Sequence, residues 1–387
     1  MRWQNKGHEF DHVYKNLAEK SGFWLFGAGM YGEAMHKELE KMESRILGFI
    51  DNNELRRHRE YMGKEILSLQ DISLKDHEAI IVCVSPFSRS SVMRQLMLAG
   101  YIYNQNVFTM ETYMSLKYVY DLKKMYIPSI SFLPSTVCNL NCEACLNFTP
   151  YIKHQMIRSL EQVKEDVDIF FHAVDYIMLF HISGGEPFLY PHLKELVIYI
   201  GENYREKIHF FQTVTNGTVM PEEEILEILA KYEVGVTVDD YREAVPEKAD
   251  IFEKVVKKLQ RYHIRYDVNK VDHWIDLAPT KTDHSTWDER RLIKHFEACH
   301  EPWQELRGGR LYSCNYASYG AVAGLAEEVE DETFDLRNFD RSRIKELMEF
   351  RMGYNEKGYV DFCKKCAGFV DINENIVEPA KQKRRSI

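Results

Sequence analysis

The chain has 387 residues, a formal net charge of −10, 45% hydrophobic residues and 28% charged residues. This composition is typical of a globular protein of two or three domains and excludes a long disordered tract. The negative charge disfavours nucleic-acid binding, and the sequence shows neither an apolar run of about 18 residues, which a membrane span needs, nor an N-terminal signal peptide.

The first elements of the chain predict a strand, a glycine-rich turn, a helix and a second strand. Apolar runs at 22–26 and 46–50 flank an amphipathic stretch, and the second run ends at Asp51. The turn carries three glycines in G-x-G-x-x-G spacing: Gly27, Gly29 and Gly32. Glycines at this spacing allow a phosphate to approach the backbone at a helix N-terminus, and an acidic residue about 20 positions on can bind a ribose.

A strand at 79–84 and an amphipathic stretch at 90–98 continue the alternation, so residues 1–125 predict a Rossmann-like domain. The sequences at 26–29 and 48–53 resemble the nucleotide-sugar-binding N-terminal domains of bacterial acyltransferases and related surface-glycan proteins. A bound dinucleotide and a unit that binds nothing and serves as a docking surface are the alternatives. The aromatic segment 101–127 has no clean period and predicts a packed connection.

From residue 128 onward the sequence predicts repeated strand–helix units. Predicted strands lie at 129–137, 176–182, 208–214, 234–238 and 264–268. Predicted helices lie between them at 160–170, 193–200, 222–230 and 251–259. Units of this length form a parallel sheet or a partial barrel, with the functional residues at the carboxyl ends of the strands.

Three cysteines follow the first of these strands within eight residues: Cys138, Cys142 and Cys145. One compact loop with this spacing can bind three irons of a cubane cluster and leave the fourth iron open, as a catalytic metal site requires. A structural zinc site is the alternative. Zinc usually takes four ligands, however, and the nearest further candidate, His154, lies nine residues beyond Cys145.

This loop resembles the cluster-binding motif of the radical S-adenosylmethionine (radical SAM) enzymes. The second strand ends in a sequence that resembles the family's motif for the amino group of S-adenosylmethionine: Ser183, Gly184, Gly185 and Glu186. The third and fourth strands end in polar residues that the resemblance places in the cofactor pocket, with ordinary strand-end caps as the alternative: Thr215, Asn216, Thr237 and Asp239. The residue before the third cysteine is usually aromatic in this family but is Ala144 here, so Phe148 or Tyr151 could fill that space.

The resemblance covers residues 128–270 and implies a partial (β/α)6 radical SAM barrel over residues 126–290. In this family the open iron binds the amino and carboxylate groups of S-adenosylmethionine. One electron, from a flavodoxin- or ferredoxin-type donor, then splits that cofactor into methionine and a 5′-deoxyadenosyl radical, which abstracts hydrogen from a C–H bond. Cysteines in ligand spacing, without a secretory signal, also fit a reducing cytoplasm.

The C-terminal part of the chain, residues 291–387, contains four further cysteines: Cys299, Cys314, Cys363 and Cys366. Their spacing, with Gly309 ahead of the second, resembles the twitch domain, the short form of the SPASM extension of radical SAM enzymes. That resemblance implies a second, auxiliary [4Fe–4S] cluster, and a structural zinc site is the alternative. The basic tail at 381–385 predicts a frayed, solvated end.

The sequence thus predicts an α/β protein with a Rossmann-like domain, a partial barrel and a small auxiliary-cluster domain. The function we expect is a cytoplasmic radical SAM oxidoreductase that oxidises a sugar or nucleotide-linked sugar and passes the electron to the auxiliary cluster. Oxidation is favoured over epimerisation because no cysteine is evidently available to return a hydrogen atom. The one remaining cysteine, Cys83, lies in a predicted strand and is more typical of a core residue than of a hydrogen donor. A peptide-modifying maturase, a sugar epimerase and a non-catalytic iron–sulfur or zinc sensing module are the alternatives.

Overall fold

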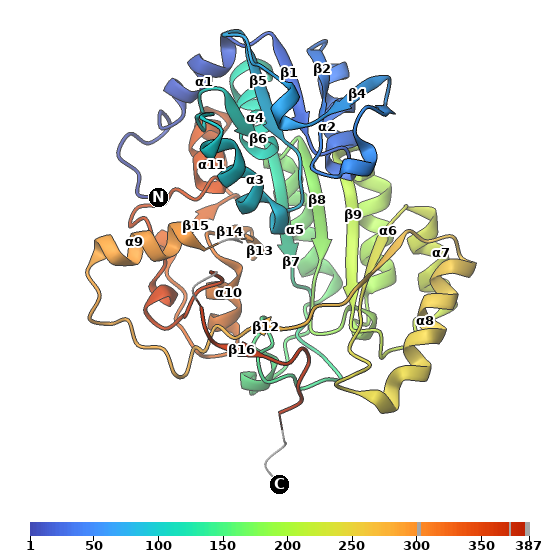
Figure 1. The fold of residues 1–387 in the computed structure, drawn as a ribbon. Helices are drawn as coiled ribbons and strands as arrows, with labels where there is room; N and C mark the ends of the chain where they lie inside the picture. The colour runs from blue at the N-terminus through green and yellow to red at the C-terminus, as the bar shows by residue number, and fades with distance from the viewer. Residues whose placement is uncertain (300–302, 371–372, 384–387) are drawn as a thin grey trace. The chain divides into compact units, whose positions relative to one another are not determined.

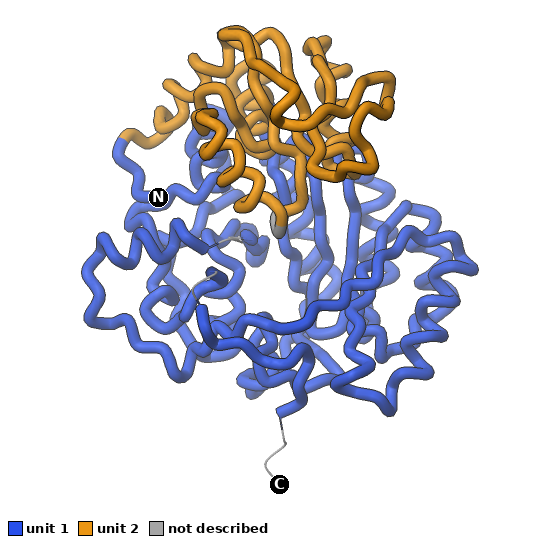
Figure 2. The backbone as a smooth tube through the Cα atoms, in the orientation of Figure 1, with its two compact units in different colours: residues 1–4, 124–387 blue, residues 5–123 orange. Residues whose placement is uncertain are grey.

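The computed structural model describes residues 1–299, 303–370 and 373–383. The chain divides into two compact units (Figure 2): unit 2 is formed by residues 5–123, and unit 1 by residues 1–4 together with 124–387. Both units combine helices with a sheet that is largely parallel, so the predicted mixed α/β class is confirmed. None of the helices in the described ranges is both long and apolar enough to cross a membrane.

Unit 2 contains a sheet in the order β3-β4-β2-β1-β5-β6, in which only the β3–β4 pair is antiparallel. Its strands are β1 (Gly22–Phe26), β2 (Arg45–Ile50), β3 (Glu60–Tyr61), β4 (Lys64–Leu67), β5 (Glu78–Val82) and β6 (Val107–Thr109). Its α-helices are α1 (Asp11–Ala18), α2 (Met30–Lys41), α3 (Pro86–Leu98) and α4 (Met110–Leu116).

The segment 101–127 differs from its prediction as an irregular connection. It contains β6, α4 and a π-helical turn at Lys117–Leu122. The Thr109 side chain caps α4 by accepting a hydrogen bond from the Thr112 N–H. A three-residue strand followed directly by a buried helix shows no period in the sequence, because both elements are buried on nearly all sides.

Unit 1 is built on a sheet in the order β11-β10-β9-β8-β7-β13-β14-β15. Its strands are β7 (Tyr126–Phe132), β8 (Tyr176–Ile182), β9 (Ile208–Thr215), β10 (Gly235–Asp239), β11 (Tyr266–Asn269), β13 (Glu305–Arg307), β14 (Arg310–Tyr312) and β15 (Thr333–Asp335). Its α-helices are α5 (Leu160–Ala173), α6 (Leu193–Asn203), α7 (Glu223–Lys231), α8 (Ala249–Arg261), α9 (Glu289–Ala298), α10 (Asn315–Val322) and α11 (Ile344–Arg351).

The strands from β11 to β13 are parallel, whereas β14 and β15 are added antiparallel. Residues 291–387, predicted as a separate domain, share unit 1 with 126–290 because β13 pairs directly with β7. Figure 1 shows α6, α7 and α8 on one side of this sheet and α9 and α10 on the other side of the unit.

The predicted strand at 129–137 is wrong at its carboxyl end, because β7 stops at Phe132. Beyond that residue the backbone bonds to other loops: the Thr136 N–H donates to the Met156 carbonyl at 2.9 Å. The strand therefore ends five residues before Val137, and a longer loop carries the cysteines.

The two faces of the unit 1 sheet differ in chemistry. Phe132, Phe180 and Phe211 lie in adjacent strands, and the ring of Phe180 packs against the other two and against the aromatic side chains of α5. Their chain neighbours Ser131, His181 and Gln212 are aligned across the same strands. Since side chains alternate along a strand, this second row is polar and faces away from α5.

Glu305 on β13 is fully buried, and burial raises the pKa of its carboxyl to about 7, despite Arg307 Nε 3.6 Å away. A raised folded-state pKa stabilises the fold below the unfolded pKa of about 4.5, and this contribution is lost as the pH rises through 7. We compare the unfolding free energy of Glu305→Gln with that of the wild type. From pH 5 to pH 8 we expect this difference to shift in favour of the variant by on the order of 3 kcal/mol. Anaerobic urea unfolding at both pH values measures this difference.

The control for this prediction is Glu328→Gln, which alters the exposed carboxylate that contacts the same guanidinium, Arg307 Nη2, at 2.6 Å. An exposed pair contributes little to stability, so this variant keeps the pH dependence of the wild type. Equal pH dependence of Glu305→Gln and the wild type would contradict the assignment of a buried, protonatable Glu305.

Candidate functional site

The three clustered cysteines lie in the loop that follows β7, at the carboxyl end of the parallel strands. The neighbouring loop after β8 holds this loop in place through two backbone hydrogen bonds. The Gly185 N–H donates to the Ser135 carbonyl at 3.0 Å, and the Glu186 N–H donates to the Val137 carbonyl at 2.7 Å. The structure therefore places the predicted Gly-Gly-Glu sequence directly against the residues that precede Cys138.

Gly185 has no room for a side chain. A Cβ built there would lie 2.3 Å from the Val137 carbonyl oxygen and 2.5 Å from that of Thr136. At Gly184 the nearest atom would be the Ser135 carbonyl oxygen at 3.3 Å, and the Asn147 amide donates to the Gly184 carbonyl. The second glycine is thus the one that the close backbone approach requires.

Glu186 connects the loops after β8 and β9. Its carboxylate accepts hydrogen bonds from the backbone N–H groups of Phe188 at 3.2 Å and Asn216 at 2.8 Å. The side chain is buried, and burial raises its pKa to about 7. The sequence predicts that the Glu186 carboxylate binds an amino group. In this structure each of its oxygens accepts a hydrogen bond from a backbone N–H.

Asn216 extends this contact to the cysteine loop. Its side-chain amide donates to the Asn139 Oδ1 at 3.0 Å and lies 3.8 Å from the Cys138 sulfur. Asn139 in turn donates to the Thr218 hydroxyl at 2.7 Å. The Thr215 hydroxyl accepts the Gly217 N–H at 3.2 Å. The predicted residue Asn216 therefore lies beside Cys138, together with Asn139 and Thr218, which the sequence reasoning missed, whereas the predicted Thr215 bonds within its own loop.

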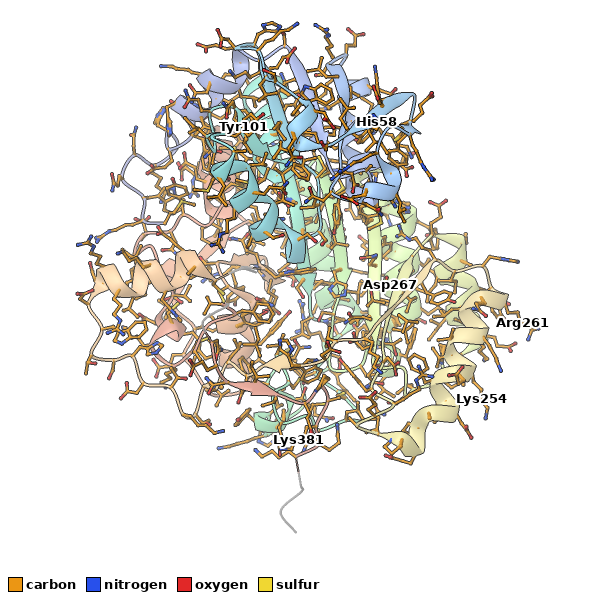
Figure 3. The ribbon with its side chains drawn as sticks, in the orientation of Figure 1. His58, Tyr101, Lys254, Arg261, Asp267 and Lys381 are labelled. Atoms are coloured by element: carbon orange, nitrogen blue, oxygen red, sulfur yellow. The ribbon has the colours of Figure 1, made fainter. Side chains whose placement is uncertain are left out.

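The fourth-strand residues form a separate group. The Asp239 carboxylate accepts hydrogen bonds from the Tyr241 hydroxyl and the Asn269 amide, both at 2.8 Å. Burial raises the pKa of Asp239. The Thr237 hydroxyl bonds to the Asp267 carboxylate at 3.2 Å, and Figure 3 labels Asp267 on its edge strand. Tyr241 packs in one apolar cluster with the cysteine loop, so it links Asp239 to that loop.

The three thiols are shielded and close enough to affect one another. The pKa of Cys138 and of Cys142 is raised to about 12, mainly by burial and in smaller part by the charge of Cys145. The Leu140 N–H lies 3.4 Å from the Cys138 sulfur and can donate to it. A deprotonated thiol in such a place needs a cation, and iron supplies the compensating charge.

The second set of cysteines is also gathered within unit 1. Cys299 follows α9, Cys314 precedes α10, and Cys363 and Cys366 lie in and after a short 3-10 helix. The pKa of Cys363 is raised well above its ordinary value. Burial is the largest cause, and the charges of the other three thiols contribute to the same shift. The imidazole nitrogens of His284 and His295 lie 3.0 Å from the carbonyls of Cys363 and Cys366, respectively.

The donor atoms suit iron–sulfur clusters. The Cys, His, Asp and Glu side chains of the described residues form no group of three or more that could hold one metal ion. A zinc ion needs all its ligands within about 2.3 Å of one point, whereas each thiolate of a cubane cluster binds a different iron. Cys138 and Cys142 both lie close enough to Cys145 to respond to its charge, and neighbouring thiols of this kind are the donors that a cubane cluster uses.

Phe148 packs toward the C-terminal cysteines. It is buried in a cluster with three of them, where its ring meets Phe362 edge-on at a centroid distance of 5.6 Å. Tyr151 packs at the border of the same cluster. The replacement of the family's usual aromatic residue by Phe148 or Tyr151 stays a prediction.

The glycine turn of unit 2 is closed by Asp51. Its carboxylate accepts the backbone N–H groups of Ala28 at 3.0 Å and Asn53 at 2.8 Å. A Cβ on Gly32 would lie 1.9 Å from the Gly27 carbonyl oxygen, whereas one on Gly29 would meet no atom within 4 Å. Gly32 and Asp51 thus shape the turn itself, and the space above Gly29 is open.

Comparison with known families identifies the central segment. Residues 132–289, which include the three-cysteine loop and the Gly-Gly-Glu sequence, match the family described as the Radical SAM superfamily. The chain carries a radical SAM domain. A domain of this superfamily implies an enzyme that uses a [4Fe–4S] cluster and S-adenosylmethionine. Residues 20–104 match a second family, described as C2185-like, N-terminal.

Several solved structures resemble the chain in part, all at low identity. The chain of anSMEcpe with bound AdoMet and the Cp18Cys peptide is 20% identical over 38% of this chain and 44% of its own length, with a TM-score of 0.32. SuiB of Streptococcus suis bound to the precursor peptide SuiA is 17% identical over 48% of this chain and 45% of its own, with a TM-score of 0.31.

BtrN in complex with AdoMet and 2-DOIA is 18% identical over 65% of this chain and 98% of its own, with a TM-score of 0.39. The chain described here thus covers less than half of the length of the first two of these structures. No curated protein matches it.

Substitution of Gly185 tests the close approach of the two loops of the radical SAM domain. We expect Gly185→Ala to lower the unfolding free energy by about 1–3 kcal/mol, because the new methyl group overlaps the Val137 carbonyl. Gly184→Ala is the matched control, and we expect a smaller loss from it. Anaerobic urea unfolding followed by circular dichroism measures both. A larger loss from the control than from Gly185→Ala would contradict the described loop geometry.

Proposed function

We propose that this chain is a radical SAM oxidoreductase that acts on a sugar or a nucleotide-linked sugar. The observation that carries the proposal is the junction of three loops at the carboxyl ends of β7, β8 and β9. There a loop with three thiols meets the Gly-Gly-Glu backbone and the Asn216 amide. Cys138, Cys142 and Cys145 would hold a [4Fe–4S] cluster, which supplies the electron that cleaves S-adenosylmethionine to a 5′-deoxyadenosyl radical.

The chain's own residues would position the cofactor and keep water out. Ser183, Gly184 and Gly185 offer backbone groups beside the cysteine loop. Glu186 fixes the loop that carries Asn216, and each of its carboxylate oxygens has a second lone pair that could accept a hydrogen bond from an amine. Asp239, held by Tyr241 and Asn269, is the carboxylate that would contact a ribose.

A polar substrate fits the other face of the sheet better than an apolar one. The row Ser131, His181 and Gln212 lies across three adjacent strands on the face opposite the aromatic core. Further along, Thr237 and Asp267 continue a polar surface on the next two strands. Hydroxyl and amide groups of this kind suit a substrate rich in hydroxyls, because each can both donate and accept hydrogen bonds, as hydroxyls do.

Oxidation is the reaction that the remaining cysteines favour. Cys299, Cys314, Cys363 and Cys366 would hold an auxiliary [4Fe–4S] cluster that accepts an electron from the substrate radical, while the substrate loses a proton. Cys83, which an epimerase could use as a hydrogen donor, is 3% exposed in unit 2 and its thiol donates to the Ile81 carbonyl at 3.4 Å. Burial raises its pKa well above the ordinary value, which disfavours a reactive thiol.

The N-terminal segment would bind the nucleotide part of such a substrate. It has a parallel sheet, a glycine turn ahead of α2 and open space above Gly29. Because radical chemistry needs no hydride carrier, a nucleotide-linked sugar is a better candidate for this turn than a nicotinamide cofactor. A peptide substrate is the second candidate for the whole chain and an outcome of the test below.

The proposal is tested by 5′-deoxyadenosine formation in the anaerobically reconstituted, reduced protein, with and without a pool of nucleotide sugars. We expect cleavage that rises with the pool and a product two mass units lighter than its substrate, since oxidation removes about two hydrogens. A product of unchanged mass would indicate epimerisation. Cleavage of S-adenosylmethionine at the same rate with and without the sugars would indicate a peptide or another carrier as the substrate.

Iron content separates the two proposed clusters. We expect about eight irons per wild-type chain and about four in either Cys142→Ser or Cys363→Ser, since each cubane cluster contains about four irons. Only the first variant should lose 5′-deoxyadenosine formation entirely, because Cys142 belongs to the loop that meets the Gly-Gly-Glu sequence. A wild type with full iron that cleaves no S-adenosylmethionine would contradict the enzyme proposal and favour a sensing module.

A further inference from the structure

The last described residues of unit 1 form a segment that crosses the cysteine loop; we call residues 373–383 the C-terminal strap. At its start the Asn373 amide donates to the Gly368 carbonyl at 2.7 Å, two residues after Cys366. Its middle part, β16 (Ile376–Val377), pairs antiparallel with β12 (Trp274–Ile275). Figure 1 shows this pair at the end of the unit where the chain leaves for its C-terminus.

The end of the strap pairs with the cysteine loop through its backbone. The Glu143 N–H donates to the Lys381 carbonyl, and the Lys383 N–H donates to the Asn141 carbonyl, each at 2.7 Å. These bonds form an antiparallel bridge between Cys142 and Gln382. The prediction of a frayed tail is therefore wrong for residues 381–383, because they satisfy backbone groups of the loop; residues 384 and 385 lie outside the described residues.

Side chains reinforce this pairing. Ala380 is fully buried in an apolar cluster with Leu140, Cys142 and Val245. The Lys381 ammonium lies 3.2 Å from the Glu143 carboxylate, and Figure 3 labels Lys381 next to the end of the described chain. The strap thus covers one side of the loop, and the Cys142 side of that loop is the most shielded: Cys142 is buried, whereas Cys138 and Cys145 are only partly buried.

The Gln382 amide has one orientation. Its oxygen accepts the Asn141 N–H at 2.8 Å, so its nitrogen must face the other way. That nitrogen donates to the Ala380 carbonyl at 2.6 Å and to the Cys142 sulfur at 3.2 Å. A flipped amide would set its NH2 group against the Asn141 N–H and its oxygen against the carbonyl and the sulfur. A hydrogen bond to a thiol ligand is therefore built into the strap.

We propose that the C-terminal strap is part of the radical SAM cluster site and that Gln382 is a positioning residue that sets the reduction potential of that cluster. The inference rests on the proposed function, in which Cys142 is an iron ligand. An N–H donated to a ligand sulfur stabilises negative charge there. One-electron reduction adds negative charge, so the bond favours the reduced state and raises the midpoint potential.

The strap also shields the cluster from water and from chelators. Its backbone closes the loop between Asn141 and Glu143, and Ala380 excludes solvent from the Cys142 side. Loss of ordered contacts around a metal site costs about 10–100-fold in metal affinity in other proteins. Removal of the strap end should therefore release iron faster without removing any ligand.

Gln382→Met tests the hydrogen bond, since it keeps the side-chain length and removes the N–H. We expect a more negative midpoint potential for the cluster whose EPR spectrum changes when S-adenosylmethionine is added. Gln382→Glu keeps the acceptor for the Asn141 N–H but sets a negative charge by the sulfur, and we expect a shift in the same direction. Lys383→Met is the matched control; its ammonium lies over the Tyr151 ring, so the variant leaves the Gln382 amide in place, and the potential should stay at the wild-type value.

Chain length tests the shield. A chain ending at Lys383 keeps the strap, and we expect it to lose iron to an excess of chelator at the wild-type rate. A chain ending at Pro379 lacks Ala380 and Gln382, and we expect iron of the S-adenosylmethionine-responsive cluster to be lost about 10-fold faster or more. The auxiliary cluster should be unaffected in both, which serves as an internal control for folding.

The results separate this inference from the proposed function. A wild type without any S-adenosylmethionine-responsive cluster would overturn both. A wild type with that cluster, in which the Gln382 variants keep the potential and the chain ending at Pro379 keeps the rate of iron loss, would overturn the strap alone. Shifted potentials in Gln382→Met but not in Lys383→Met, with full iron in both, would support it.

Discussion

The close backbone contact between the loops after β7 and β8 is the constraint on which the site depends. Two hydrogen bonds join the Gly185 and Glu186 N–H groups to the carbonyls of Ser135 and Val137, immediately before Cys138. Only glycine fits at the first position, because a Cβ there would overlap the opposing carbonyls. The direction in which the cysteine loop leaves the sheet, and hence the place of its thiols, follows from this contact.

A buried carboxylate extends the constraint to the third loop. Glu186 would be costly to bury without partners, and two backbone N–H groups, one of them from Asn216, compensate it. The pKa of this carboxyl is raised because burial outweighs the two hydrogen bonds. An amine or another cation nearby would favour its ionised form. The site is therefore arranged so that ligand binding could relieve an existing electrostatic cost.

The two groups of thiols belong to one compact unit, and its packing relates them. Phe148, three residues after Cys145, lies in the same apolar cluster as Cys314, Cys363 and Cys366. The strap runs the opposite way, from the region of Cys366 to the sulfur of Cys142. Both connections pass through apolar clusters, one around Phe148 and one around Ala380. Burial raises the pKa of five of these thiols, so iron binding there would displace protons and couple to folding; the five are Cys138, Cys142, Cys314, Cys363 and Cys366.

The sequence by itself determined the chemistry: cysteine spacing, the Gly-Gly-Glu sequence and alternating apolar runs each depend on near neighbours in the chain, and these patterns predicted the α/β class and the radical SAM domain. The tertiary structure decided the rest. The joining of β13 to β7, the closure of the glycine turn by Asp51 and the bond from Gln382 to Cys142 link residues far apart in sequence. No local pattern encodes such pairings, because their partners are brought together only when the sheets and their loops have packed.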